Sequence, residues 1–150
     1  MTQTKKRIET LGYNALDIAK YIIKYEGERG YCISNLKLQK ILYFLQAEFL
    51  VLIGKSLFNE DLIAWDFGPI VESVYYEYKV YGGAQIASKI NDHAYIDKKH
   101  RGIINNLLEE IREYSTTQLA HFCHNQTPWK TARVRLNNVI NLDELRDFFC

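Results

Sequence analysis

The densest group of chemically active side chains is the stretch "HFCH", which holds His121, Cys123 and His124. Imidazole and thiolate groups are ligands that zinc prefers, and two histidines three residues apart share one face of a helix. A zinc site needs further ligands, and the other cysteines and histidines could supply them only by chance of folding. We therefore expect no metal or cofactor here. His124 is expected to hydrogen-bond a backbone group or a buried polar neighbour.

The sequence carries no recognisable catalytic motif. Cys123 and His124 do not form a nucleophilic pair, because adjacent residues of a helix point about 100° apart. The sequence also lacks a phosphate-binding glycine loop, a GxSxG elbow and an HExxH pair. We predict that the protein is not an enzyme. An uncharacterised activity around His124 and Trp129 stays open as a third hypothesis.

Basic residues raise the question of nucleic-acid binding. The stretch "PWKTARVR" brings Lys130, Arg133 and Arg135 close together, where a phosphate or an acidic partner could dock, although a solvated helix face explains them equally well. The formal net charge is only +1, which gives no general attraction to a polyanion. We expect no nucleic-acid partner, and keep a regulator that binds the nucleic acid of its own operon as the alternative function.

Composition describes an ordinary globular chain. Its 150 residues suit one domain, and a hydrophobic content of 47% argues against extended disorder. Three scattered cysteines are typical of reduced thiols in a cytoplasm, and neither a leader nor a membrane span is expected. Tyrosines are numerous, at 11, and serve either the edge of the core or a contact surface.

One long helix should organise the fold. Ser34 is a helix cap, and the segment after it, which ends at Gly54, carries apolar residues on two nearly opposite stripes. The first stripe holds Leu38, Ile41, Leu42, Leu45, Phe49 and Leu52, and a narrow polar row beside it holds Lys37, Lys40 and Glu48. A helix apolar on most of its circumference belongs in the middle of a fold, surrounded by other helices.

Other helices are expected around this one. The first is capped by Asn14 and ends at Gly27, and the second covers about residues 100–114. Ser115 is the predicted cap of the third, and Thr127 caps the fourth with Pro128 at its first helical position. A last helix is predicted in "LDELRDFF". Residues 1–13 read as a polar lead-in. The segment 84–100 reads as a loop with a short helical or extended piece.

The crossing between the central helix and the next one contains "AWDFGP". An extended piece is predicted at Leu62–Trp65. Gly68 permits a sharp turn, and Pro69 suits the first turn of a helix that runs from Ile70 to Gly82. We therefore predict an all-α or nearly all-α fold, as one domain over residues 1–150 with its core at about 14–135.

Several joined motifs resemble the Panacea family of SocA-like antitoxins and phage-associated GepA-like proteins. They are the cap Ser34, the helix segment "KLQKILY", the turn "GKSLF" and the corner "WDFGPI". The later "LAHFCHNQTPWKTAR" is similar to a further family segment, with Ala120 and Cys123 where serine and threonine are usual. These two departures put in doubt any role that the hydroxyl groups would have.

The resemblance implies a helical bacterial or phage protein that neutralises a cognate toxin by direct binding, in one branch as an adaptor to a ClpXP-type protease. The residues that it marks as family motif or partner-binding are Lys37, Gln39, Lys40, Tyr43, Trp65, Gly68, Pro69, Tyr75, Tyr76, His124 and Trp129. Within them we expect the Trp65–Pro69 corner to clamp two helices together. Tyr76, on the side of its helix away from Val74, is expected to contact the partner.

Overall fold

A computed structural model describes residues 7–87 and 93–150 of the chain. Its helices are α1 (Ala15–Glu28), α2 (Asn35–Leu52), α3 (Glu72–Tyr78), α4 (Lys98–Ile111), α5 (Thr116–His124), α6 (Thr127–Arg133) and α7 (Leu142–Phe149). Its strands are β1 (Thr10–Tyr13), β2 (Ser56–Phe58), β3 (Ile63–Trp65) and β4 (Gly68–Ile70), paired in two sheets. The prediction of a mostly helical fold is confirmed, and the two small sheets make it less than purely helical.

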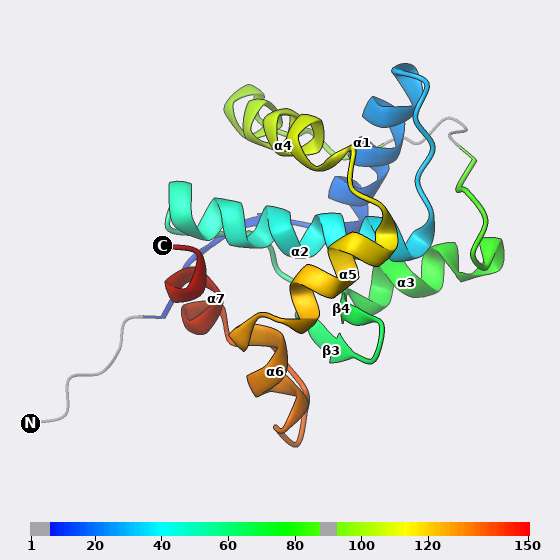
Figure 1. Ribbon diagram of the computed structural model, residues 1–150. Coiled ribbons are helices and arrows are strands. Elements are labelled where there is room, and N and C mark those ends of the chain that lie inside the picture. Colours follow the sequence, from blue (N-terminus) through cyan, green and yellow to red (C-terminus); the bar gives the residue numbers. More distant parts are fainter. Residues whose placement is uncertain (1–6, 88–92) are drawn as a thin grey trace, which may run out of the picture.

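Helix α2 runs through the middle of the molecule. Helices α1 and α4 lie on one side of it, and the β3–β4 hairpin and α6 lie on the other (Figure 1). It contacts α1, α3, α4, α5 and α7 as well as strands β2 and β4. Leu38, Leu42, Leu45 and Phe49 are fully buried, and Leu50 on the opposite stripe is buried too. The predicted central position of this helix is confirmed.

Most helix starts follow the predicted caps. The side chains of Asn14, Ser34 and Ser115 each accept a hydrogen bond from a backbone N–H group in the first turn that follows. Ser115 and Gln118 form a reciprocal capping box, which also satisfies the N–H group of the cap residue. These bonds satisfy backbone donors that have no partner inside the helix, so the starts of α1, α2 and α5 were predictable from local sequence.

Two helix starts differ from prediction by one or two residues. Helix α4 begins at Lys98, before the expected position 100, because Asp97 accepts a hydrogen bond from the Lys99 N–H group and acts as its cap. In helix α6 the cap position belongs to Gln126, so Thr127 is already helical and the prediction of a Thr127 cap is wrong.

Strands β1 and β2 form a parallel pair that the sequence did not predict. The interpretation of residues 1–13 as a lead-in is wrong for Thr10–Tyr13, and residues 1–6 lie outside the described part. Buried Gln46 of α2 holds β2 in place, because its Oε1 atom accepts a hydrogen bond from the Leu57 N–H group at 2.7 Å. Four residues are too few to show an alternating pattern, and the pairing partner is distant in sequence.

Strands β3 and β4 form an antiparallel hairpin in which Trp65 pairs with Gly68 across a two-residue turn. The extended piece predicted at Leu62–Trp65 is confirmed. The prediction of Pro69 in a first helical turn is wrong, since Pro69 lies in β4 opposite Ala64. A proline is tolerated in a strand at a position where its missing N–H group is not needed for pairing.

Helix α3 consequently begins at Glu72 rather than at residue 70, and a short 3₁₀ turn (Lys79–Tyr81) extends it. Gly82, with φ of +56°, ends this turn as predicted. The sequence predicted a loop at 84–100, and residues 88–92 of it lie outside the described part. Within this segment Gln85 forms an isolated β-bridge with Ser34. None of the described helices has the length and apolar character that crossing a membrane requires.

Candidate functional site

The residues that the resemblance marked gather around the β3–β4 hairpin. Its inner side faces α2, where Lys40 is fully buried and its Nζ atom donates a hydrogen bond to the Pro69 carbonyl oxygen at 3.3 Å. Gly68 has φ of +108°, and a Cβ atom there would lie 2.7 Å from the Lys40 Cε atom. The backbone angle therefore favours glycine at position 68, and a Cβ atom there would also force the Lys40 side chain to shift.

Burial changes the acid–base chemistry of Lys40 and its neighbour Cys123. Removal from water disfavours the charged form of an amine, and it lowers the pKa of Lys40 to about 8, although Cys123 has a small opposing effect. Burial raises the pKa of the Cys123 thiol to about 12. At neutral pH this pair is therefore an ammonium group and a neutral thiol, so Cys123 is no activated nucleophile.

Gln39 connects α2 to the start of α3. Its Oε1 atom accepts a hydrogen bond from the Val71 N–H group at 2.8 Å, and its Nε2 atom donates one to Asn35 at 3.0 Å. Asn35 in turn donates to the Tyr75 carbonyl oxygen at 3.0 Å. This carbonyl lies in the last turn of α3, which ends at Tyr78. The side chains of α2 thus satisfy both ends of α3.

Helix α6 holds the outer edge of the hairpin. The Trp129 Nε1 atom donates a hydrogen bond to the Trp65 carbonyl oxygen at 2.9 Å. Arg133 donates to the Ala64 carbonyl oxygen at 3.1 Å and forms an ion pair with Asp66 at 2.5 Å. The predicted role of the Trp65–Pro69 corner as a clamp stays a prediction, and these contacts support it. The basic patch at "PWKTARVR" is partly neutralised, because Arg133 is paired.

Helix α5 completes the inner layer. The His124 ring packs against the Trp129 ring with centroids 4.4 Å apart. Its Nε2 atom is buried and has no hydrogen-bond partner in the structure, so the expected hydrogen bond is missing at this nitrogen. Tyr43 is buried and donates to Gln126 Oε1 at 2.5 Å, and burial raises the pKa of its hydroxyl. These contacts fix the α5–α6 connection on α2.

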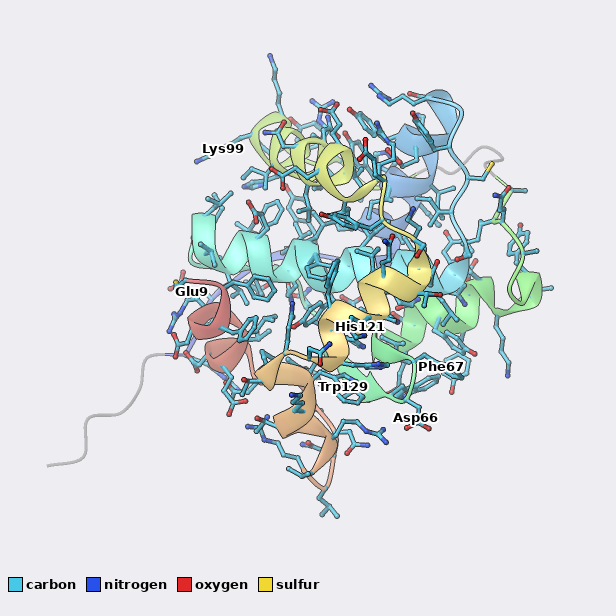
Figure 2. The ribbon with its side chains drawn as sticks, in the orientation of Figure 1. Glu9, Asp66, Phe67, Lys99, His121 and Trp129 are labelled. Carbon is cyan, nitrogen blue, oxygen red and sulfur yellow. The ribbon has the colours of Figure 1, made fainter. Side chains whose placement is uncertain are left out.

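The outer side of the hairpin carries exposed aromatic side chains instead. Phe67 in the turn is 55% exposed and Tyr76 on α3 is 56% exposed. Half-buried Tyr75 lies between them and the clamp, with its ring 5.0 Å from Trp65 and 5.6 Å from Tyr76. We call Phe67, Tyr75 and Tyr76 the aromatic face; the label of Phe67 marks its edge in Figure 2.

A shallow pocket of about 150 Å³ adjoins the aromatic face, lined among others by Leu36, Phe67, Tyr75 and Lys79. The Lys79 ammonium group lies 5.8 Å from the centre of the Tyr76 ring. Tyr76 and Lys79 point away from the buried Val74, as the helical spacing predicted. The arrangement offers apolar contact area next to one positive charge.

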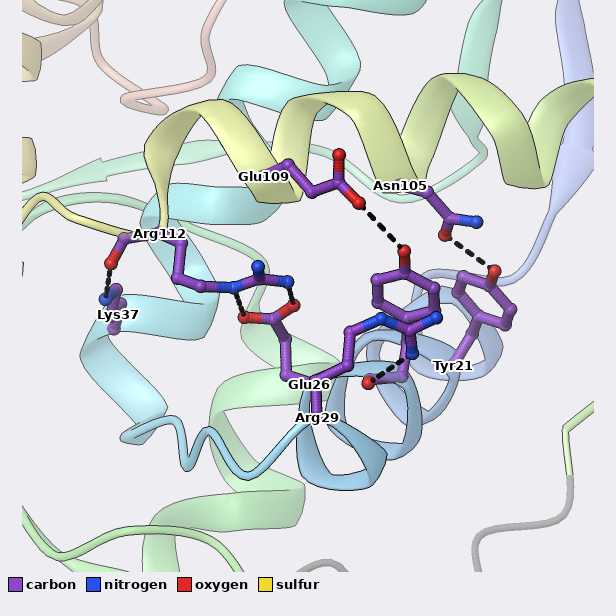
Figure 3. Close-up of polar contacts among 8 residues, drawn as sticks. Tyr21, Glu26, Arg29, Lys37, Asn105, Glu109 and Arg112 are labelled. Atoms are coloured by element: carbon purple, nitrogen blue, oxygen red, sulfur yellow. Dashed lines mark hydrogen bonds and ion pairs between the residues drawn. The ribbon is translucent and has the colours of Figure 1, made fainter.

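Two sequence-predicted groups lie apart from this site. Lys37 projects toward α4, where its Nζ atom donates a hydrogen bond to the Arg112 carbonyl oxygen at 3.1 Å (Figure 3). In "HFCH", His121 is exposed and Cys123 is buried, so they do not converge on one point. Within residues 7–87 and 93–150, no three potential metal-binding side chains of the His, Cys, Asp and Glu types gather.

Sequence reasoning missed the roles of three residues that hold the site together. Asn35 and Arg133 act on backbone groups that are distant in sequence, and Asp66 pairs with Arg133 across the hairpin. Only the position of Asn35 directly after the Ser34 cap carried a local signal. Such long-range hydrogen bonds depend on the completed fold and leave no periodic pattern in the sequence.

Comparisons with known proteins give a consistent result. A family model described as "Antitoxin SocA-like, Panacea domain" matches residues 38–130, which is more than half of the chain. The curated protein "Antitoxin SocA" of Caulobacter vibrioides is 54% identical over 43 residues. That stretch covers 29% of this chain and 23% of the relative, so the comparison spans about a quarter of that protein. No solved structure matches the chain.

Proposed function

The chain belongs to the SocA-like antitoxins with a Panacea domain, and from this premise we propose that it neutralises a cognate toxin protein by direct binding. In this proposal a single domain, with its core at about residues 14–135, binds the toxin. The binding takes place in the cytoplasm, where such a toxin is made. The protein acts here as a binding partner and carries out no chemical reaction of its own. Nucleic acid and membrane are not part of the proposed mechanism.

The observation that carries the proposed binding site is the contrast in exposure across the hairpin. Phe67 and Tyr76 are each more than half exposed, while the segment that presents them is tied to α2, α5 and α6. Aromatic side chains on a rigid support are frequent anchors of protein–protein contacts, because they bury a large area and lose little conformational entropy. We assign toxin contact to the aromatic face.

The chemistry of the aromatic face defines what the toxin must offer. The pocket of about 150 Å³ beside Phe67 and Tyr75 can accept an apolar side chain. Lys79 at its rim favours an acidic group next to that side chain, since the two charges would attract each other. In this proposal the aromatic face is positioned by Lys40, Gln39, Tyr43, His124 and Trp129. Lys40, Gln39 and Tyr43 are buried, so they do not touch the toxin.

Delivery of the toxin to a ClpXP-type protease is a separate step that we propose for the bound complex. It predicts that the toxin disappears faster in cells that contain this protein than in cells without it. The half-life of the toxin after synthesis is stopped measures this step. An unchanged half-life together with full protection would mean that binding alone neutralises the toxin.

Growth rescue tests the proposed function. We expect an open reading frame beside this gene to be toxic when expressed alone and harmless when this protein is expressed with it. Tyr76→Ala should abolish the rescue at unchanged protein level. Tyr95→Ala is the matched control, because Tyr95 is also an exposed tyrosine, at 77%, but lies outside the aromatic face. A harmless neighbouring product, or toxicity that wild-type protein does not relieve, would contradict the proposal.

A further inference from the structure

Helices α1 and α4 pack on the opposite side of α2 from the hairpin (Figure 1), and charged side chains line both the contact between them and a pocket beside it. In the contact between the helices Glu26 is buried, and its carboxylate accepts hydrogen bonds from Arg112 at 2.9 and 2.5 Å. Figure 3 shows this pair beside Lys37. The buried Glu26 carboxylate is thus paired, as a buried charge requires.

A pocket of about 420 Å³ lies beside this pair, lined on the α1 side by residues that include Tyr21, Lys24 and Arg29 (Figure 3). Among the described residues, three cationic side chains line it, Lys24 from α1, Arg29 from the cap that ends α1 and Arg101 from α4, against one carboxylate, that of Glu28. None of these four forms an ion pair within residues 7–87 and 93–150. An excess of positive charge in a concave site attracts an anion.

The two arginines of this pocket differ in their hydrogen bonds. The Nε atom of Arg101 is buried and has no hydrogen-bond partner in the structure. Because this atom is shielded from solvent, a ligand would meet Arg101 through the part of its side chain that lines the pocket. The Arg29 guanidinium lies 3.4 Å above the Tyr25 ring and donates to the Tyr25 carbonyl oxygen at 3.0 Å, which fixes its plane and leaves further N–H groups to donate.

Neutral residues shape the remainder of the wall. The Tyr21 hydroxyl donates to Asn105 Oδ1 at 2.7 Å, so the Asn105 oxygen is occupied and its amide N–H groups remain as donors (Figure 3). The His93 ring meets the Tyr21 ring edge to face with centroids 5.4 Å apart. The pocket therefore combines donors for an anion with an aromatic wall.

We propose that this pocket binds a small phosphorylated metabolite of the size of a nucleoside monophosphate. A volume of 420 Å³ exceeds the needs of a free inorganic ion and falls in the range of about 300–1,000 Å³ typical of small-molecule sites. Three cations against one carboxylate match the charge of a phosphate monoester near neutral pH. Guanidinium groups suit phosphate because their donors form a planar fork.

Titration calorimetry with three probes tests this site independently of toxin neutralisation. We expect AMP to bind the wild-type protein, inorganic phosphate to bind more weakly, and adenosine not to bind. Affinity for AMP should fall as salt is raised, because the attraction is electrostatic. Equal binding of adenosine and AMP, or no binding of AMP at low salt, would overturn the proposal.

Two variants and a matched control locate the binding. Arg101→Gln and Lys24→Gln should each weaken AMP binding about tenfold or more, the usual effect of losing a charged hydrogen-bond donor. Lys99→Gln removes the same charge from an exposed position of α4 outside the pocket and should leave the affinity within about twofold. Because Lys24 is exposed, its variant keeps the test valid even if Arg101→Gln fails to fold. Unchanged affinity in Lys24→Gln would overturn the assignment.

Discussion

The two sides of the β3–β4 hairpin use neighbouring residues for opposite purposes. On the inner side Gly68 touches the buried Lys40, and the Trp65 carbonyl oxygen accepts a hydrogen bond from Trp129. On the outer side Phe67 and Tyr76 are more than half exposed. Motif residues in one short segment therefore divide into those that hold the hairpin and those that present a surface.

This division has a simple geometric origin. In the tight turn Phe67 points outward, while the next residue, Gly68, packs against α2. In α3 the helical spacing buries Val74 and Tyr78 and leaves Tyr76 between them on the exposed side. Substitutions on the inner side should therefore change the stability of the fold, and substitutions on the outer side should change binding. The following variants test this separation.

The largest loss of stability is expected for Leu42→Ala, below the inner side. Leu42 is fully buried in the middle of α2. Removing its side chain leaves a cavity, and we expect the free energy of unfolding to fall by about 2–5 kcal/mol. Denaturant unfolding at 25 °C measures this change. A loss below about 1 kcal/mol would show that α2 is not the centre of the core.

Trp65→Ala tests the clamp. The Trp65 ring packs against Tyr75 with centroids 5.0 Å apart, and the residue is only partly buried. Fully buried tryptophans lose about 3–5 kcal/mol on truncation, so we expect about 2–4 kcal/mol here. Toxin rescue should be lost only as far as the protein unfolds. A variant that keeps the wild-type melting temperature but fails to rescue would place Trp65 on the contact surface.

Lys40→Met tests the buried amine through pH. The pKa of Lys40 is about 8, against an ordinary value of 10.5, so between these pH values the unfolded chain binds a proton that the folded chain does not. Stability of the wild type relative to Lys40→Met should therefore rise by about 3 kcal/mol from pH 8 to pH 10.5, because the cost of a buried charge disappears as the amine loses its proton.

The comparison with a variant is needed because other groups titrate in the same range. Burial raises the pKa of Cys123 to about 12, so the wild type loses stability as its unfolded thiol ionises. This loss is common to wild type and Lys40→Met, and it cancels when their unfolding free energies are subtracted. Lys99→Met is the exposed control. A difference between wild type and Lys40→Met that stays constant with pH would contradict the buried position of the amine.

The smallest change in stability is expected for Tyr76→Ala on the outer side. The Tyr76 side chain is 56% exposed, and its closest charged neighbour is Lys79. Surface substitutions usually change stability by less than about 0.5 kcal/mol, so its melting temperature should match that of the wild type. Thermal melts at equal concentration check this. A clearly lower melting temperature would move Tyr76 from the contact surface to the structural clamp.

Local patterns predicted the helices well and the hairpin poorly. Caps such as Asn14 and Ser34 act within one turn, so their effect can be recognised in the sequence. Pro69 fits both the first turn of a helix and a strand, and the pairing of Trp65 with Gly68 decided between them. Cross-strand pairing depends on the register of two segments rather than on the preference of one residue.

The candidate site was predictable in its outer part only. Helical spacing placed Tyr76 on the exposed side of its helix correctly. The burial of Lys40 was not foreseen, because a lysine in a helix usually reaches solvent and only the approach of Gly68 and Pro69 encloses this one. The buried amide of Gln39, which serves the Val71 N–H group, was equally invisible in the local pattern.

The affinity of purified toxin for three versions of this protein tests the central claim most directly. The toxin is the product of the neighbouring gene, and the versions are wild type, Tyr76→Ala and the control Tyr95→Ala. Truncation of an interface anchor costs about 2 kcal/mol or more, so we expect Tyr76→Ala to raise the dissociation constant about thirtyfold, with Tyr95→Ala equal to wild type. Equal dissociation constants for wild type and a fully folded Tyr76→Ala would contradict the assignment of toxin binding to the aromatic face.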